Sequence, residues 1–243
     1  FKRLARGLAL TEEGQAYLPV VQDAITRLAV GTNEIFGQHQ RRPIKVRGSL
    51  SFFVHWLAPK LVSFQQAHPQ VDIRYISNIW VKELDGEDDM EIRWGHGQWP
   101  GLVAQRLTWD SLVPVCSPAL MARSPIKEPS DVAQHRLLHV LGYEEGWGYW
   151  ANMVGAQGVD PSSGMQFDTL ISTLRMAELG QGIALARSSM VVELLREGRL
   201  VEPFQQRIEA SESFYLVRGA GADQHPDAVM FATWLVEQAH RFK

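Results

Sequence analysis

The chain has 243 residues, of which 45% are apolar and 21% charged, and its formal net charge is −3. This composition is ordinary for a globular protein of one or two domains. No run of about 18 apolar residues is present to span a membrane. The single cysteine, Cys116, excludes an intramolecular disulfide and fits a reducing compartment. We therefore expect a cytoplasmic protein without membrane contacts.

The chain begins with a short basic segment, FKRLARGLAL. Its charges come from Lys2, Arg3 and Arg6, whereas the chain as a whole is acidic. A basic end on an acidic body favours contact between the first residues and a polyanion, because phosphate groups attract clustered cations. A solvated basic tail would carry the same charges and is the alternative.

A long amphipathic helix is predicted over residues 11–37. Thr11 stands at the N-cap position, where its hydroxyl can accept from a free backbone N–H group. Apolar or small residues then recur at alternating gaps of four and three, which is the spacing of a coiled-coil seam. We expect the seam to pair with another copy of the chain, and the alternative is packing on its own domain. The predicted dimerisation residues are Tyr17, Val21, Ala24 and Leu28.

After a polar linker over residues 38–43, strand patterns alternate with helical patterns to the end of the chain. Such alternation predicts an α/β protein with open sheets and right-handed crossovers. Two similar units follow one another, and two strands, Leu112–Cys116 and Phe214–Val217, are expected to join them. The sequence therefore predicts a two-lobed domain. Lobe I is predicted to comprise residues 44–115 and 216–243, and lobe II to comprise residues 116–215.

Several motifs resemble those of the LysR-type transcriptional regulators. FKRLAR followed by LTEEG is similar to the wing of a winged helix-turn-helix and the start of the linker helix in that family. Five further motifs, in order and at the right separations, resemble its subgroup of glycine-cleavage activators and β-lactamase regulators. They are WLAP from Trp56, EIRWG from Glu91, WPGL from Trp99, PVCSP from Pro114 and GQGIA from Gly180.

This resemblance implies a periplasmic-binding-protein-like effector domain over residues 44–243, with residues 1–10 as the remnant of a DNA-binding wing. Arg3 and Arg6 would touch DNA, and the winged helix-turn-helix of the family would precede residue 1. The implied protein is a homodimer or homotetramer that binds DNA and senses a small molecule without a cofactor. The alternative is a periplasmic solute-binding protein, which has no use for a basic wing and a seam helix.

An effector is expected at the carboxyl ends of the strands and between the lobes. This rule selects turns that directly follow predicted strands. Plain helix capping explains Ser51, Asp168 and Thr169 equally well on sequence alone. Core packing is the usual role of tryptophans such as Trp94 and Trp147, and only the resemblance favours a site. The candidate effector-binding residues are Ser49, Ser51, Phe52, Asn78, Trp94, Tyr143, Trp147, Phe167, Asp168 and Thr169.

The sequence contains no recognisable catalytic constellation. Ser124 and Lys127 have the S-x-x-K spacing of penicillin-recognising enzymes, but the companion motifs S-D-N and K-T-G do not occur. His135 and His139 lack an evident third metal ligand, so ordinary surface histidines are the better interpretation. Cys116 lies in an apolar strand and has no obvious base. We predict neither an enzyme nor a metal site.

Overall fold

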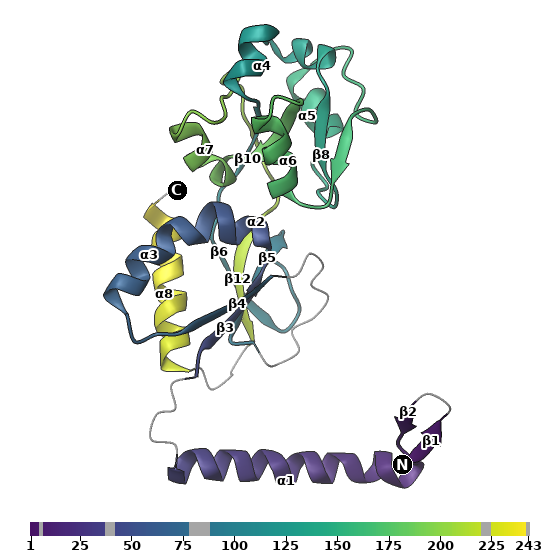
Figure 1. Ribbon diagram of the computed structural model, residues 1–243, viewed down its shortest axis with the longest axis vertical. Coiled ribbons are helices and arrows are strands. Elements are labelled where there is room, and N and C mark those ends of the chain that lie inside the picture. The colour runs from purple at the N-terminus through teal and green to yellow at the C-terminus, as the bar shows by residue number, and fades with distance from the viewer. Residues whose placement is uncertain (5–6, 37–41, 78–87, 220–224, 242–243) are drawn as a thin grey trace. The chain divides into compact units, whose positions relative to one another are not determined.

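The chain forms two compact units, Phe1–Arg42 and Pro43–Lys243, in a computed structural model (Figure 1). None of the helices that the structure describes is long and apolar enough to cross a membrane. The described residues are 1–4, 7–36, 42–77, 88–219 and 225–241.

The first unit consists of a β-hairpin and a long helix. Strands β1 (Lys2–Leu4) and β2 (Gly7–Ala9) pair antiparallel, and helix α1 covers Glu12–Phe36. The Thr11 hydroxyl accepts a hydrogen bond from the Gly14 N–H at 3.1 Å. The predicted N-cap is therefore confirmed, because this bond satisfies one of the free N–H groups of the first turn.

Most of the interaction residues predicted for this unit are exposed. Arg6 and residues 37–41, which include most of the predicted linker, lie outside the described residues. The exposed residues are Arg3 on β1 and Tyr17, Ala24 and Leu28 on α1, while Val21 is partly buried.

The second unit has two lobes, each built on a five-stranded sheet (Figure 1). The strands of lobe I are β3 (Ile44–Gly48), β4 (Ile73–Ser77), β5 (Met90–Gly95), β6 (Leu102–Arg106) and β12 (Ser213–Gly219). Their order is β4-β3-β5-β12-β6, with β3 parallel to both β4 and β5, and β12 antiparallel to both β5 and β6. The carboxyl ends of the three parallel strands therefore lie at one edge.

Helices cover the lobe I sheet. After β3 the chain continues through α2 (Leu50–Phe52) and a π-helical turn, η1 (Phe53–Leu57), into α3 (Ala58–Ala67). The final helix, α8 (Pro226–Arg241), runs beside α3 (Figure 1). Phe64 of α3 lies 4.9 Å from the ring of Phe231 and 5.0 Å from that of Trp234, both on α8. These aromatic contacts join α3, near the start of the lobe, to its last helix.

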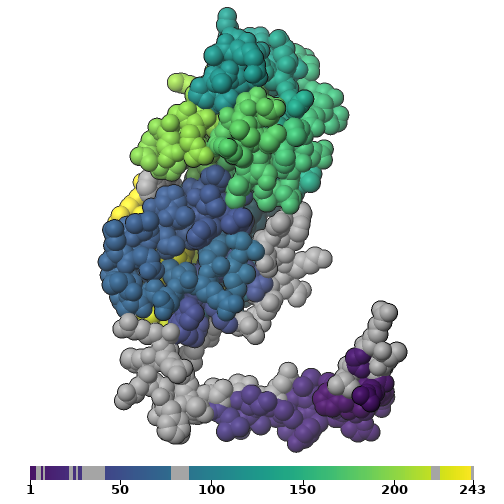
Figure 2. Space-filling view, in the orientation of Figure 1, coloured from purple at the N-terminus to yellow at the C-terminus, as the bar shows by residue number. Residues whose placement is uncertain are grey.

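Lobe II has the strand order β11-β7-β10-β8-β9, where β8 is parallel to β9 and β10, and β7 is antiparallel to β10 and β11. These strands are β7 (Ser111–Val115), β8 (Leu137–Val140), β9 (Met165–Phe167), β10 (Ile183–Arg187) and β11 (Ile208–Glu209). The helical segments are α4 (Pro118–Arg123), η2 (Pro129–Gln134), α5 (Trp147–Val154), α6 (Leu170–Glu178), η3 (Ser188–Met190) and α7 (Val192–Arg196). Figure 2 shows lobe II in green meeting lobe I in blue.

The two-lobed α/β prediction is confirmed, but the chain crosses between the lobes at other points than expected. β7 completes its hydrogen bonds within the lobe II sheet, and β12 completes its bonds within the lobe I sheet. The crossings therefore precede these strands, at residues 107–110 and 210–212. Two backbone hydrogen bonds hold the crossings together. The Leu107 N–H donates to the Phe214 carbonyl (2.8 Å), and the Ala210 N–H donates to the Asp110 carbonyl (2.9 Å).

Candidate functional site

A cleft with a volume of about 760 Å³ lies between the two lobes. From lobe I it is bounded by residues that end or follow β3, β4 and β5, and from lobe II by the turn after β8 and the start of α6. The described residues that line it include Ser49, Ser51, Ser77, Glu91, Arg93, Trp94, Trp99, Leu141, Tyr143, Asp168 and Thr169.

Six of the ten candidate residues line this cleft: Ser49, Ser51, Trp94, Tyr143, Asp168 and Thr169. Asn78 lies outside the described residues. The other three are not among the lining residues. Phe52 is fully buried against Trp56 and Phe214, at ring distances of 4.8 and 4.9 Å, and Phe167 packs at the edge of the core.

Trp147 belongs to the core of lobe II, and not to the cleft. Its ring lies 5.3 Å from that of Trp150 in a perpendicular arrangement, and its indole N–H donates to the Leu138 carbonyl at 3.1 Å. The indole is thus fully packed and hydrogen-bonded as the first residue of α5. Core packing, the alternative recognised from the sequence, is the correct interpretation here.

The two candidate serines have different roles in local structure. Ser49, and not Ser51, caps α2, because its hydroxyl accepts from the Phe52 N–H at 3.1 Å. Ser51 is buried in the first turn, yet it lines the cleft. The Ser51 hydroxyl is therefore a polar group of the cleft wall that the helix cap does not require.

On the lobe II side, Thr169 caps α6. Its hydroxyl accepts from the Ser172 N–H at 3.3 Å and lies 2.9 Å from the Ser172 hydroxyl. The neighbouring Asp168 is exposed and also lines the cleft. Capping and cleft formation therefore coincide at Thr169, as the sequence pattern allowed.

Aromatic rings form one wall of the cleft. The Trp94 ring lies 5.2 Å from that of Tyr143 and 4.7 Å from that of Phe214. Trp94 and Phe214 belong to lobe I, whereas Tyr143 belongs to lobe II, so this stack bridges the lobes. Burial raises the pKa of the Tyr143 phenol to about 12, so the hydroxyl stays protonated at neutral pH.

A fully buried arginine supports this wall from behind. The Arg187 guanidinium lies 4.7 Å from the Tyr143 ring and 5.2 Å from the Trp94 ring. It donates twice to the Glu145 carbonyl oxygen at 3.3 Å and pairs with the carboxylates of Glu145 (3.8 Å) and Glu212 (3.7 Å). Burial raises the pKa of Glu212, and the Arg187 charge opposes that shift. Sequence reasoning missed Arg187, because it ends a strand that otherwise reads as apolar.

A second missed ion pair lies at the cleft itself. Glu91 is fully buried, and its carboxylate accepts from Arg93 at 2.7 and 2.8 Å. Both residues belong to β5 and line the cleft. The Arg93 guanidinium therefore lies at the cleft wall with its charge already balanced by the Glu91 carboxylate. This arrangement favours a polar ligand over a strongly charged one.

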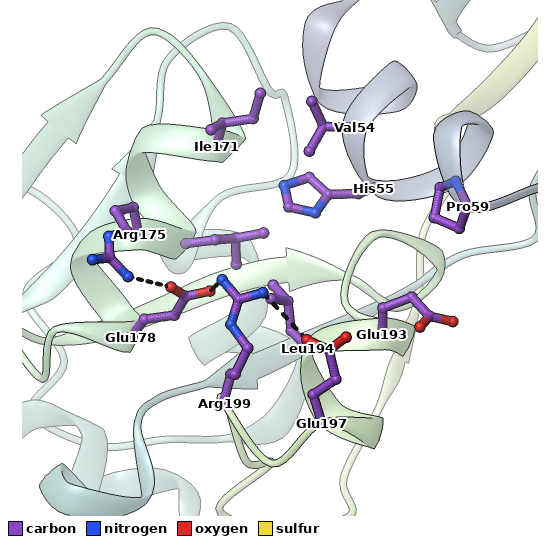
Figure 3. Close-up of a pocket in the computed structure, with 11 residues that line it drawn as sticks. Val54, His55, Pro59, Ile171, Arg175, Glu178, Glu193, Leu194, Glu197 and Arg199 are labelled. Atoms are coloured by element: carbon purple, nitrogen blue, oxygen red, sulfur yellow. Dashed lines mark hydrogen bonds and ion pairs between the residues drawn. The ribbon is translucent and has the colours of Figure 1, made fainter.

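A smaller pocket of about 420 Å³ lies between η1 of lobe I and helices α6 and α7 of lobe II (Figure 3). Arg175, Glu178, Arg199 and Glu197 form an ion-paired row there, with distances of 2.8, 2.7 and 3.3 Å. His55 points into the pocket opposite this row (Figure 3). Its buried Nε2 has no hydrogen-bond partner among the described residues, and burial lowers its pKa, an effect that Glu178 opposes.

Comparison with known proteins agrees with this architecture. Residues 37–240 match the LysR substrate binding domain. The glycine cleavage system transcriptional activator of Escherichia coli K12 is 33% identical over 98% of this chain and 79% of that protein. The transcriptional activator AmpR of Pseudomonas aeruginosa is 33% identical over 98% of this chain and 80% of that protein. The AmpR effector binding domain from Citrobacter freundii superposes with a TM-score of 0.73 at 28% identity, over 82% of this chain and 99% of that chain.

The two sheets and the cleft between them define an effector-binding domain with a periplasmic-binding-protein-like fold. The family match and the two relatives go further, and the chain belongs to the LysR family of transcriptional regulators. The matched family model is a substrate-binding domain, and the two relatives are transcriptional activators. The same matches favour this family over the alternative of a periplasmic solute-binding protein.

The buried position of Arg187 predicts a large loss of stability in Arg187→Met. The substitution leaves Glu145 and Glu212 buried without their cation, which costs about 3–5 kcal/mol for a broken buried ion pair. Urea denaturation followed by circular dichroism measures the change. Arg196→Met is the control, since Arg196 pairs with Glu193 at the surface and should contribute little. Equal stability of the two variants would contradict the assigned role.

His55 predicts a pH dependence of stability. Its folded-state pKa is lowered by burial, so the unfolded chain takes up a proton at a higher pH than the folded protein. The stability from neutral His55 is therefore complete above about pH 6.5 and is lost as the pH falls through the folded pKa. We expect the melting temperature to fall less between about pH 7.5 and about pH 5 in His55→Gln than in the unmodified protein. Parallel melting curves for both proteins would disprove this.

Proposed function

We propose that the cleft between the lobes binds a small polar effector, and that closure of the cleft around it controls a DNA-binding oligomer. The observation that carries this proposal is that six of the ten candidates, which were selected as turns after strands and favoured by the family resemblance, line one cleft. Ser49, Ser51 and Trp94 come from lobe I, and Tyr143 and Thr169 come from lobe II.

The size and lining of the cleft indicate the class of ligand. Its volume of about 760 Å³ falls in the range of small-molecule sites. Hydroxyl groups of Ser51 and Ser77 and the ion-paired Arg93 offer donors and acceptors, while Trp94 and Trp99 supply apolar surface. This mixture suits a small molecule with both polar groups and a hydrocarbon portion.

Binding rather than catalysis is the proposed activity. The described residues that line the cleft include serine and threonine hydroxyls but no histidine or cysteine, so no serine–histidine pair is assembled there. The relatives that match most of the chain are transcriptional regulators. We infer a non-enzymatic protein that acts in the cytoplasm.

The mechanism requires the two lobes to respond together. An effector that contacts both walls stabilises the arrangement of lobes that it fits best, and its differential affinity sets the size of the shift. The Trp94–Tyr143 stack already spans the lobes at the cleft. Ligand contacts with these two rings would therefore affect both lobes.

We assign the remaining parts of the chain by the same proposal. Residues 1–10 belong to a DNA-binding wing, with Arg3 and Arg6 as DNA contacts, and α1 is the dimerisation helix. Tyr17 and Leu28 of α1 are 64% and 71% exposed, although both are large and apolar. Pairing of two α1 helices along the predicted seam would remove this surface from water.

We predict that Ser51 donates or accepts a hydrogen bond with a ligand in the cleft. A panel of amino acids, nucleotides and sugar phosphates is screened by thermal shift, and the affinity of each stabilising compound is measured by calorimetry. We expect Ser51→Ala to weaken binding about tenfold, which corresponds to about 1.4 kcal/mol for one lost hydrogen bond. Ser63→Ala removes an exposed hydroxyl on α3 and should leave the affinity unchanged. Unaltered binding by Ser51→Ala would place the ligand elsewhere.

We predict that charged substitutions in the seam of α1 dissociate the oligomer. The double variant Val21→Glu, Leu28→Glu places like charges at two seam positions, so we expect it to lower the solution mass to that of the 27.4 kDa monomer. Light scattering coupled to size exclusion measures the mass. Gln15→Glu adds a negative charge at an exposed position off the seam and should retain the oligomer. An unmodified chain that is already monomeric at micromolar concentration would refute the role of α1.

A further inference from the structure

Three residues that are distant in the sequence meet at the seam between the lobes. His96 follows β5 of lobe I, Glu144 lies in the turn after β8 of lobe II, and Glu212 lies on the returning crossing directly before β12. One ligand atom from each side chain lies within 4.8 Å of the other two. Each part of the junction therefore contributes one residue to the cluster.

The imidazole faces the first carboxylate. His96 Nε2 and Glu144 Oε2 are 3.5 Å apart. Two ligand atoms on one tetrahedral metal ion are separated by about 3.3–3.6 Å when the metal–ligand bonds are about 2.0–2.2 Å. This pair thus already has the separation that a shared ion requires, and a carboxylate oxygen of Glu212 lies within 4.8 Å of the other two ligand atoms.

One carboxylate oxygen of the buried member of the cluster lacks a hydrogen-bond partner in the described part of the chain, while the Glu144 backbone N–H interacts with the carboxylate and lowers its pKa. Glu212 is only 4% exposed, and its Oε2 atom has no hydrogen-bond partner among the described residues. The nearest cation is the Arg187 guanidinium at 3.7 Å, which is too long for a hydrogen bond. A buried carboxylate oxygen without a donor is costly, and a bound cation would satisfy it.

The charges around the cluster also favour a cation. Asp110, Glu145 and Glu212 are all buried, and each influences the buried cation Arg187. Three carboxylates thus surround one guanidinium, and the exposed carboxylate of Glu144 adds a further negative charge at the edge. Four carboxylates near one guanidinium leave a local excess of negative charge, which attracts a cation.

We propose that His96, Glu144 and Glu212 form a binding site for a divalent transition-metal ion, with Zn²⁺ as the preferred ion. An imidazole nitrogen with two carboxylate oxygens is a ligand set that suits zinc and related metals, whereas calcium and magnesium prefer oxygen alone. Three protein ligands leave at least one coordination position open for water.

The position of the site predicts that a bound ion holds the two lobes in one arrangement. Its ligands come from lobe I, lobe II and the crossing between them, so binding fixes the lobes in the arrangement that brings the three together. Gly95 (φ +146) and Gly97 (φ +81) flank His96 and hold the turn that presents it. Zinc would therefore act at the hinge, beside the cleft residues Trp94 and Tyr143.

The test is zinc binding by the full chain without an affinity tag, measured by calorimetry and by competition with a chromophoric chelator. We expect one Zn²⁺ per chain and a higher melting temperature with zinc. Glu144→Gln and His96→Asn should each weaken binding about tenfold or more. Burial raises the pKa of the only thiol, Cys116, to about 11, so that residue should not compete for the ion.

Glu197→Gln is the matched control, since it removes an accessible lobe II glutamate that is not part of the cluster. It should bind zinc as the unmodified chain does. Both cluster variants change exposed side chains, and circular dichroism verifies that they fold. The proposal is overturned if the unmodified chain binds no stoichiometric zinc, or if all four proteins bind it with equal affinity.

Discussion

The junction of the lobes depends on one buried guanidinium. Arg187 ends β10 in lobe II, pairs with Glu145 and Glu212, and lies behind the rings of Trp94 and Tyr143. A buried charge is tolerated only where partners compensate its loss of hydration. The position of this arginine therefore constrains the turn after β8, the returning crossing and the aromatic wall at the same time.

This constraint links the cleft to the hinge. Glu145 accepts from the Ser211 N–H at 2.9 Å as well as pairing with Arg187, so the turn that presents Tyr143 is tied to the returning crossing. The two crossings are in turn joined by backbone hydrogen bonds on both sides. A change in the cleft that moves Tyr143 therefore acts on the segments about which the lobes would rotate.

Most local structure followed from the sequence, and part of the candidate site did as well. The hydroxyl of Thr11 and the spacing of the apolar residues predicted α1, and the turns after strands predicted the cleft positions of Ser51, Trp94 and Thr169. Trp147 was a wrong candidate for the cleft, because a tryptophan after a strand reads alike whether it enters a cleft or a core. Its hydrogen bond to Leu138 only becomes visible in three dimensions.

The sequence by itself determined the long helix α1, its cap at Thr11 and the two-lobed α/β class, because periodicity and capping depend on neighbours a few residues apart. The tertiary structure alone decided that β7 pairs within lobe II and β12 within lobe I. It also decided which charges meet at the junction. The partners of Arg187 and the residues that meet His96 come from distant segments, and their proximity arises from the packing of whole lobes, which no local pattern encodes.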